Sequence, residues 1–377
     1  MTALYLHFPF CLQKCRYCSF NSIPVPEDDM LVTGYLQALE KEIAIYASFY
    51  PNESLSSIYL GGGTPTVLPA ESLCRILSRC KESFVCSPEI EITIEANPGT
   101  VTQKMLQLLK DAGVNRLSLG VQSFKSAELG LLGRSHSVSE VYAAYDAARK
   151  AGFDNINLDL IYALPGQSLQ FWRDNLRSAI RLSPEHLSIY GLSLEDSTPL
   201  AVDLKKGKLE ACSEEMQLSM WEETASMVAE AGFIRYEFSN YAQPGKECRH
   251  NITYWENRPY LGVGAGAHGY HEHVRYGNEQ EIQKYIEMVE KGEFPRAFEE
   301  QQSPKEEMVD TIIMGLRLTK GLSRPDFTRR FGCSFESLYE KVLKKLVDDG
   351  LMAISDEAVF LTERGQLLSN YVLSFFV

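Results

Sequence analysis

Three cysteines near the start of the chain have the spacing of a metal-binding loop. Cys11, Cys15 and Cys18 form a C-x3-C-x2-C pattern directly after a strand-like run. Cysteine thiolates hold iron–sulfur clusters, four in the closed type, so a loop with three leaves one iron with an open position. Structural zinc also takes four ligands, and the next cysteine is as distant as Cys74. The pattern therefore favours an iron–sulfur cluster over zinc and over unliganded thiols.

A glycine-rich turn follows the second strand-like run. Its sequence is Gly61-Gly62-Gly63-Thr64-Pro65. Glycines let the backbone approach a ligand closely and leave N–H and C=O groups free to bind it. A plain tight turn is the alternative, because a glycine run alone is not specific. The residues of the turn leave both interpretations open.

Two carboxylates, Glu95 and Asp159, stand at the ends of later strand-like runs. In barrels of parallel strands, ligands bind at the carboxyl ends of the strands. Either residue alone could instead cap a helix or lie on the surface. Together with the cysteine loop, they predict a site at that end of the strands.

The elements that must position these residues alternate between strand and helix. The strand-like runs are 3–7, 58–60, 91–95, 117–121, 155–161 and 187–191, and the helix-period segments are 31–49, 71–82, 102–111, 139–150 and 167–181. Gly113, Gly152 and Gly232 each follow a helical segment and predict left-handed caps. This alternation implies parallel strands with helical crossovers. We expect an α/β fold with an incomplete (β/α)6 barrel, because six strands are too few for the closed eight-stranded form.

The organisation changes after this barrel, which we place at residues 1–200. Residues 201–300 are expected to form a linking segment, with a long helix over 213–231 and an irregular, aromatic stretch over 238–269. A loop-rich stretch of that length in a compact chain is usually functional.

Residues 301–377 indicate a winged-helix-like helical domain. The expected elements are helices at 305–318, 324–331 and 335–349, a hairpin over 351–361 and a last helix over 362–376. Ten basic and eleven acidic side chains make this unit almost neutral. We therefore expect a packing or partner domain rather than a DNA-binding one.

The composition limits the possible functions. Apolar residues make up 45% of the chain and charged residues 23%, which is ordinary for a globular protein. The net charge of −13 argues against nucleic-acid binding. No apolar run approaches the ~20 residues of a membrane span. With nine cysteines and no visible export signal, we expect a reducing, cytoplasmic location.

The cysteine loop and the glycine turn together resemble those of the radical S-adenosylmethionine (SAM) superfamily. The resemblance implies that Cys11, Cys15 and Cys18 hold a [4Fe-4S] cluster. It also implies that the glycine turn seats the methionine part of SAM, whose amine and carboxylate chelate the open iron.

Further motifs narrow the resemblance to the oxygen-independent coproporphyrinogen III oxidases and their relatives. They are Tyr5-x-His7-x-Pro9-Phe10-Cys11, the Gly-Gly-Gly-Thr-Pro-Thr run, Ile94-Glu95-Ala96-Asn97-Pro98, Gly120-Val121-Gln122-Ser123-Phe124, Arg134 and Asp159-Leu160-Ile161-Tyr162-x-Leu164-Pro165-Gly166. The resemblance implies that the cluster-bound SAM is held by Tyr5, Gly62, Gly63, Thr64 and Glu95. The positions that match those holding a second SAM in the oxidase are Tyr17, Gln122, Arg134 and Asp159.

Two departures separate the chain from the oxidase. Phe20 stands where the oxidase has a fourth cysteine, and only ten residues precede Cys11, where the oxidase has an N-terminal arm. Both features resemble the HemW-type haem chaperones instead. So does the H-N-x-x-Y-W pattern of His250-Asn251-Ile252-Thr253-Tyr254-Trp255.

That pattern suits haem, because an imidazole can ligate haem iron and aromatic side chains can cover the macrocycle. Without the resemblance, the residues favour a hydrogen-bonded His250 and core positions for Tyr254 and Trp255. With it, we expect His250, Asn251, Tyr254 and Trp255 to bind haem.

The resemblance implies a chaperone that binds haem, the cluster and SAM and delivers haem to client haemoproteins such as membrane-bound respiratory enzymes. It also implies an electron donor such as flavodoxin and a homodimer as one state of the protein. For a chaperone of this kind we expect no catalytic residue. The alternatives are the oxidase itself, which decarboxylates two propionates to vinyls, and a radical enzyme acting on another substrate.

The remaining candidates are weaker. His268, His271 and His273 could bind a metal, although their spacing is irregular, and Cys248 could contact haem or undergo redox chemistry. The other cysteines are expected to be incidental, in helical or connecting segments: Cys74, Cys80, Cys86, Cys212 and Cys333.

Overall fold

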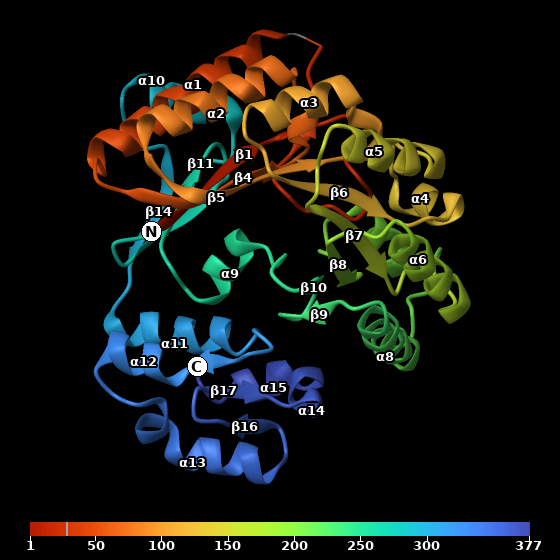
Figure 1. Ribbon diagram of the computed structural model, residues 1–377, viewed down its shortest axis with the longest axis vertical. Helices are drawn as coiled ribbons and strands as arrows, with labels where there is room; N and C mark the ends of the chain where they lie inside the picture. Colours follow the sequence, from red (N-terminus) through yellow and green to blue (C-terminus); the bar gives the residue numbers. More distant parts are fainter. Residues whose placement is uncertain (28) are drawn as a thin grey trace.

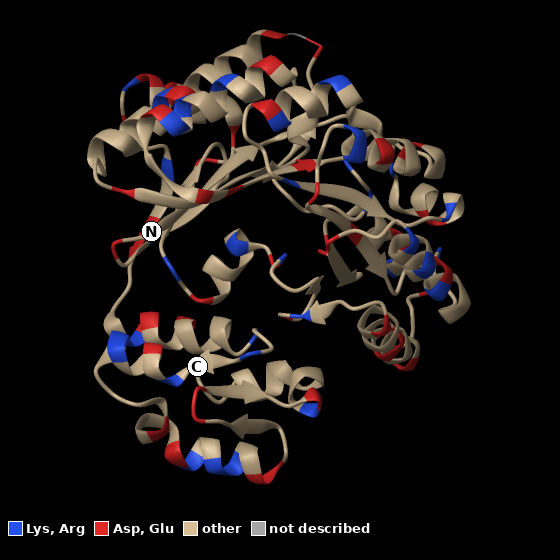
Figure 2. Ribbon diagram, in the orientation of Figure 1, with Lys and Arg blue, Asp and Glu red and all other residues tan. Residues whose placement is uncertain are grey.

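The computed structural model describes residues 1–27 and 29–377. Figure 1 shows a curved sheet with helices on its outer side, a short helix, α9 (Arg249–Trp255), in the middle, and a C-terminal helical unit below it. Figure 2 shows that basic and acidic residues are interspersed on most of the outer helices, whereas α8 (Glu214–Glu230) carries only acidic ones. In the described part of the chain, no helix combines the length and the apolar character needed to cross a bilayer.

Six parallel strands form the centre of the main sheet, as the alternation of strand and helix predicted. Their order is also their order along the chain. They are β1 (Thr2–Phe8), β4 (Ser54–Gly62), β5 (Val85–Ala96), β6 (Arg116–Gln122), β7 (Ile156–Tyr162) and β8 (His186–Gly191). The core of parallel strands with helical crossovers expected from the sequence is thus confirmed.

The prediction of a sheet limited to six strands is wrong. The sheet has twelve strands and is mixed, because strands from the segment after residue 230 extend both of its edges. Next to β8 lie the antiparallel β10 (Asn240–Ala242) and β9 (Ile234–Arg235). Next to β1 lie β11 (Tyr260–Val263), which is parallel to it, and the antiparallel β12 (His268–His271), β13 (Val274–Asn278) and β14 (Arg296–Gln301).

The stretch 238–269 is therefore not irregular, contrary to the prediction. It contains β10, α9 and β11 and the start of β12. These elements are short, and their partners lie far away in the sequence, as when Leu4 pairs with Leu261. Pairing over such separations leaves no local periodicity for a sequence pattern to reveal.

Helices cover the outer side of the sheet, and polar residues cap many of them. The predicted helices are α1 (Asp29–Phe49), α2 (Ala70–Ser83), α3 (Gln103–Asp111), α5 (Val138–Lys150), α6 (Leu169–Arg181) and α8 (Glu214–Glu230). The short α4 (Ser126–Leu132), α7 (Pro199–Lys205) and α10 (Ile282–Glu290) were not predicted. Ser137 forms a capping box at the start of α5 with Glu140. The expected left-handed glycines are confirmed, with φ of +100°, +86° and +86° at Gly113, Gly152 and Gly232.

The C-terminal unit has its own hydrophobic core. Its elements are α11 (Pro304–Gly315), α12 (Arg324–Phe331), α13 (Phe335–Asp348), a sheet of β15 (Leu322–Ser323), β16 (Met352–Ile354) and β17 (Ala358–Leu361), and the helices α14 (Glu363–Leu367) and α15 (Ser369–Leu373). The predicted hairpin is confirmed. The predicted single last helix is wrong, because Leu368 leaves the helical conformation, with φ −105° and ψ 26°.

Two side chains of α1 tie this helix to the edge of the sheet that bears the cysteine loop. The Tyr35 hydroxyl donates to the His7 carbonyl at 2.7 Å. The buried Glu42 carboxylate accepts from Gly264 N, Asn278 Nδ2 and Tyr285 Oη, each at 2.7 Å. Burial raises the pKa of Glu42 to about 7. Because buried donors that lose their acceptor destabilise a fold, Glu42 fixes the position of β11 to β13 against α1.

We predict that Glu42→Ala lowers the free energy of unfolding by about 3 kcal/mol, since several buried donors lose their acceptor together. Denaturant unfolding of the full chain, followed by circular dichroism, measures this value. Glu290→Ala on the exposed side of α10 is the control. Equal stability of the two variants would contradict the role given to Glu42.

Candidate functional site

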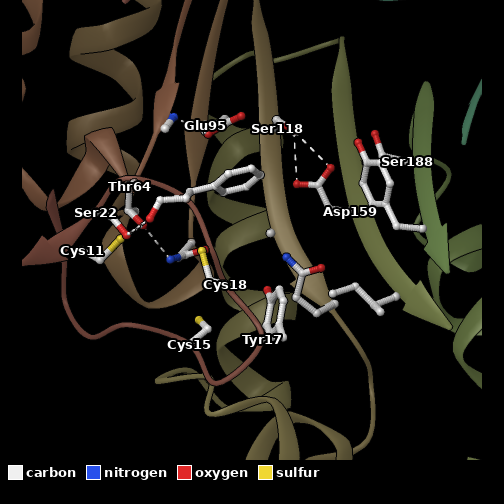
Figure 3. A pocket seen from close by; sticks show the side chains of 18 of the residues that line it. Cys11, Cys15, Tyr17, Cys18, Ser22, Thr64, Glu95, Ser118, Asp159 and Ser188 are labelled. Atoms are coloured by element: carbon white, nitrogen blue, oxygen red, sulfur yellow. Dashed lines mark hydrogen bonds between the residues drawn. The ribbon is translucent and has the colours of Figure 1, made fainter. Parts of the chain in front are cut away.

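A pocket of about 420 Å³ opens on the concave side of the sheet. Its wall combines the cysteine loop, the glycine turn and inward-facing side chains of β5 to β8. Figure 3 shows Cys11, Cys15 and Cys18 on one side of this pocket and Asp159 and Ser188 on the other. The structure thus brings together residues that the sequence separates by nearly 180 positions.

The three cysteines have free thiols and all line the pocket. The Thr64 hydroxyl lies 3.7 Å from Cys11 Sγ, and Arg134 Nη1 lies 3.4 Å from Cys15 Sγ. Burial raises the pKa of Cys18. In the described residues, no three His, Cys, Asp or Glu side chains converge tightly enough for a single metal ion. Thiols spread along one wall suit a cluster, whose irons occupy separate corners, better than a zinc ion.

Backbone hydrogen bonds hold the cysteine loop at both ends. Arg16 N donates to Leu132 O at 3.0 Å, and Arg16 also forms an ion pair with Asp203. On the other side, Ile23 N donates to Pro9 O at 2.8 Å. The loop is therefore positioned by α4, by α7 and by the end of β1.

The glycine turn packs against the end of β1. A Cβ on Gly63 would lie 2.7 Å from Phe8 O, and one on Gly62, whose φ is +106°, would lie 2.5 Å from the His7 ring. The prediction of free N–H groups here is wrong, because Gly63 N donates to Phe8 O and Thr64 N to Phe10 O. The glycines allow this close packing, which places Thr64 beside Cys11.

Glu95 connects the glycine turn with the floor of the pocket. Its carboxylate accepts from Gly62 N at 3.1 Å and from Tyr59 Oη at 2.8 Å. Burial and the nearby charge of Asp159 raise the pKa of Glu95 to about 7. The carboxyl group therefore exchanges its proton near neutral pH.

Asp159 belongs to a second buried polar group. It lies in the middle of β7 rather than at its end, which corrects the prediction. Asn157 Nδ2 donates to Asp159 Oδ1 and to Ser118 Oγ, both at 2.7 Å. Burial raises the pKa of Asp159, and the hydrogen bond from Asn157 opposes this effect.

Arg134 links the cysteine loop to the strands. Its Nη2 donates to Gly120 O at 2.7 Å and also bonds Asn97, while its Nη1 lies 3.5 Å from Tyr17 Oη. Gln122 lines the same pocket with a left-handed φ of +65°. Tyr17, Gln122 and Arg134 thus line one pocket.

Tyr5 is the one residue of the expected SAM set that does not line this pocket. Its hydroxyl lies 3.0 Å from His7 Nδ1, and its ring centroid lies 6.2 Å from that of Tyr59. Tyr5 therefore contacts Tyr59, and Tyr59 in turn donates a hydrogen bond to Glu95.

Sequence reasoning missed Arg116, which lines the pocket at 2% exposure. Its Nε has no hydrogen-bond partner among the described residues. The signal was available in the alternation of β6, where Arg116, Ser118, Gly120 and Gln122 share the concave face. It was overlooked because the apolar residues between them dominate the pattern.

The H-N-x-x-Y-W residues form α9, which lies across the concave side of the sheet (Figure 1). His250 is buried, and its Nδ1 lies 2.8 Å from Ser57 Oγ and its Nε2 2.7 Å from Tyr254 Oη. Burial lowers the pKa of His250 to about 3, so the ring is neutral at physiological pH. In this conformation neither nitrogen is presented to an iron. Asn251 faces the pocket, and Trp255 Nε1 has no partner among the described residues.

Glu91 holds the start of α9. Its carboxylate accepts from Arg249 N at 3.0 Å and from His250 N at 3.1 Å. The Cys248 thiol lies 3.4 Å from the same carboxylate, and burial raises the pKa of Cys248 to about 12. Such a thiol is protonated near neutral pH, which makes redox chemistry at Cys248 unfavourable.

The other weak candidates find structural partners. His271 pairs with Glu53 at 3.1 Å and His273 with Glu307 at 2.8 Å, so the three histidines, a weak candidate for a metal site, form no such group among the described residues. Cys86 lies in β5, against the expectation that these cysteines avoid strands.

Comparisons with known proteins agree with this geometry. The sequence profile of the radical SAM superfamily matches residues 5–178, and that of the HemN C-terminal domain matches residues 302–368. The structure of coproporphyrinogen III oxidase (HemN) from Escherichia coli aligns with a TM-score of 0.87 at 25% identity, covering 100% of this chain and 89% of that one.

Curated relatives are similar over the whole chain. The heme chaperone HemW of Bacillus subtilis is 37% identical over 100% of this chain and 99% of its own. HemW of Lactococcus lactis is 36% identical over 99% of this chain and 96% of its own, and HemW of Escherichia coli is 32% identical over 100% and 98%. The chain therefore belongs to the HemW family of haem chaperones, within the radical SAM superfamily. Membership of the superfamily implies a [4Fe-4S] cluster and SAM.

We predict that Cys15→Ala, after anaerobic reconstitution, retains less iron and sulfide than the wild type and loses the visible absorption of the cluster, because one of its three ligands is gone. Iron and sulfide analysis of the purified chain measures this. Cys333→Ala, outside the pocket, should keep the wild-type content. A zinc content instead of iron in the wild type would contradict the assignment.

Proposed function

We propose that this protein is a haem chaperone that carries a [4Fe-4S] cluster on Cys11, Cys15 and Cys18, binds SAM and haem, and delivers haem to client haemoproteins. The full-length similarity to HemW relatives supports this proposal. When bound, the cluster supplies an open iron position and one electron. The residues of the chain bind and orient the ligands around it.

Two groups of pocket residues suit SAM. The first group consists of the turn residues Gly62, Gly63 and Thr64 beside Cys11, together with Glu95. The Glu95 carboxylate can attract a cationic amine or sulfonium group. Tyr5 supports this seat through its contact with Tyr59. The second group extends from the cysteine loop across to β7 and consists of Tyr17, Gln122, Arg134 and Asp159.

The observation that carries the choice of chaperone over oxidase is Phe20. It stands where the oxidase has a fourth cysteine, and its side chain is 67% exposed at the edge of the pocket. An exposed aromatic ring at the edge of a pocket offers apolar surface against which a flat ligand can pack. A flat apolar cargo such as haem is such a ligand.

We further infer that α9 belongs to the haem-binding region. Tyr254 and Trp255 offer aromatic surface, and Asn251 faces the pocket. His250 holds α9 in place in this conformation, because both ring nitrogens are engaged. The proposal includes membrane-bound respiratory enzymes among the clients and an electron donor such as flavodoxin. It also includes a homodimer as one state of the protein and a cytoplasmic location.

The second candidate function is that of an oxygen-independent coproporphyrinogen III oxidase. The TM-score of 0.87 to that enzyme favours it, as does the arrangement of the second group of SAM residues.

Two parallel assays on anaerobically reconstituted protein separate the candidates. We expect stoichiometric haem binding in a titration and no formation of protoporphyrinogen IX from coproporphyrinogen III. A genuine oxidase, assayed alongside, controls for active reagents. Turnover at a comparable rate would establish the second candidate and overturn the first.

The pKa of Glu95 generates a separate prediction. Its carboxyl is ionised above about pH 7, so the affinity for SAM should fall as the pH drops through that value. Glu95→Gln should bind SAM weakly and with little pH dependence. Calorimetry of the reconstituted protein at several pH values measures both effects, and the exposed Glu89→Gln on the same strand is the control. A Glu95→Gln variant with the wild-type pH profile would exclude Glu95.

A further inference from the structure

A second pocket, of about 410 Å³, lies on the other side of Ser19 and Phe20 from the cysteines. These two residues line both pockets and form their shared wall. The volume falls within the range of about 300–1,000 Å³ that is usual for small-molecule sites.

Four aromatic side chains line this pocket, beside two histidines and the polar Ser19, Asn21 and Gln280. Of the four, Phe20 comes from the segment after the cysteines, Tyr5 from β1, Tyr254 from α9 and Tyr260 from β11. Such a lining suits a large flat aromatic ligand, because rings pack against it at a low cost in conformational entropy.

His268, at the start of β12, lines the same pocket and is exposed. Among the described residues its ring nitrogens have no hydrogen-bond partner. Its ring contacts Phe298, at 5.5 Å between centroids. His7 and His250 differ from His268, because both ring nitrogens of each have hydrogen-bond partners. Those of His7 are Tyr5 Oη and Asn21 O, and those of His250 are Ser57 Oγ and Tyr254 Oη. His268 therefore offers a lone pair for a metal.

Met314, on α11 of the C-terminal unit, contributes to the same pocket a thioether that is partly exposed. Imidazole and thioether form a known pair of axial ligands of haem iron. The two side chains come from different units of the fold, because His268 lies in β12 of the main sheet and Met314 in α11 of the C-terminal unit.

The position of the pocket supports the same ligand. Three sequence features separate this chain from the oxidase pattern, and two of them are Phe20 in place of a cysteine and the H-N-x-x-Y-W motif. Phe20 and Tyr254 of that motif both line this pocket. The structure thus brings two of the three features to one cavity.

We propose that this second pocket is the haem site, with His268 as an axial ligand of the iron and Met314 as the ligand from the opposite unit. The inference rests on the proposed haem-binding function and specifies its site. Because no Lys or Arg is among the residues that line the described pocket, the propionates extend from its open mouth into solvent.

The test is a haem titration of the full-length, cluster-reconstituted protein, followed by difference absorbance and electron paramagnetic resonance. We expect His268→Gly to weaken haem binding about tenfold or more and to change the spin state, and added imidazole to restore the wild-type spectrum. Met314→Leu, which conserves volume, should change the spin state with a smaller loss of affinity. His273→Ala, on the turn after β12, is the matched control and should behave as wild type.

The iron and sulfide content of each variant and its affinity for SAM show whether the pocket lined by the three cysteines is intact. A His268→Gly variant with the spectrum and affinity of the wild type would overturn this site while leaving the proposed function in place. A wild-type protein without stoichiometric haem binding would overturn the proposed function and the site together.

Discussion

Burial of polar and charged side chains on the concave face of a parallel sheet is the constraint on which the rest of the structure depends. Every second residue of a strand faces that side, and on β5 to β7 these positions include Glu95, Arg116, Ser118 and Asp159. Desolvation of such groups is costly unless each finds a partner or a ligand. The raised pKa values of Glu95 and Asp159 express this cost directly. Glu95 and Asp159 are only partly compensated by hydrogen bonds, and Arg116 Nε has no partner among the described residues, so the site is suited to bind a charged cofactor.

The same constraint explains α9. A short helix with exposed N–H groups at its start would be unstable alone, but the buried Glu91 carboxylate accepts two of them. His250 then stacks on Tyr59, at 5.0 Å between centroids, and Tyr59 donates to Glu95. The helix that distinguishes this chain from the oxidase pattern is thus joined through two side chains to the glycine turn.

The local parts of the fold could be predicted from the sequence, and the long-range parts could not. Buried apolar runs and Ser or Gly at helix ends located the central strands and most outer helices, because these signals act within a few residues. The edge strands β9 to β14 were missed, since their pairing partners lie on distant segments. For the candidate site, motif spacing identified the cysteine loop and the groups around Glu95 and Arg134. It could not show that Tyr5 lies outside the pocket. For His250 it left two interpretations, a haem ligand and a hydrogen-bonded residue, and the packing of α9 gives the second in this conformation.

The shared wall of the two pockets has a consequence for how such proteins diverge. Phe20 lines both pockets. Replacing it with cysteine therefore changes the surroundings of the three thiols and the lining of the second pocket at once. A lineage that moved between enzymatic and carrier roles could change both chambers in a single mutational step, while the strands that shape them stayed the same.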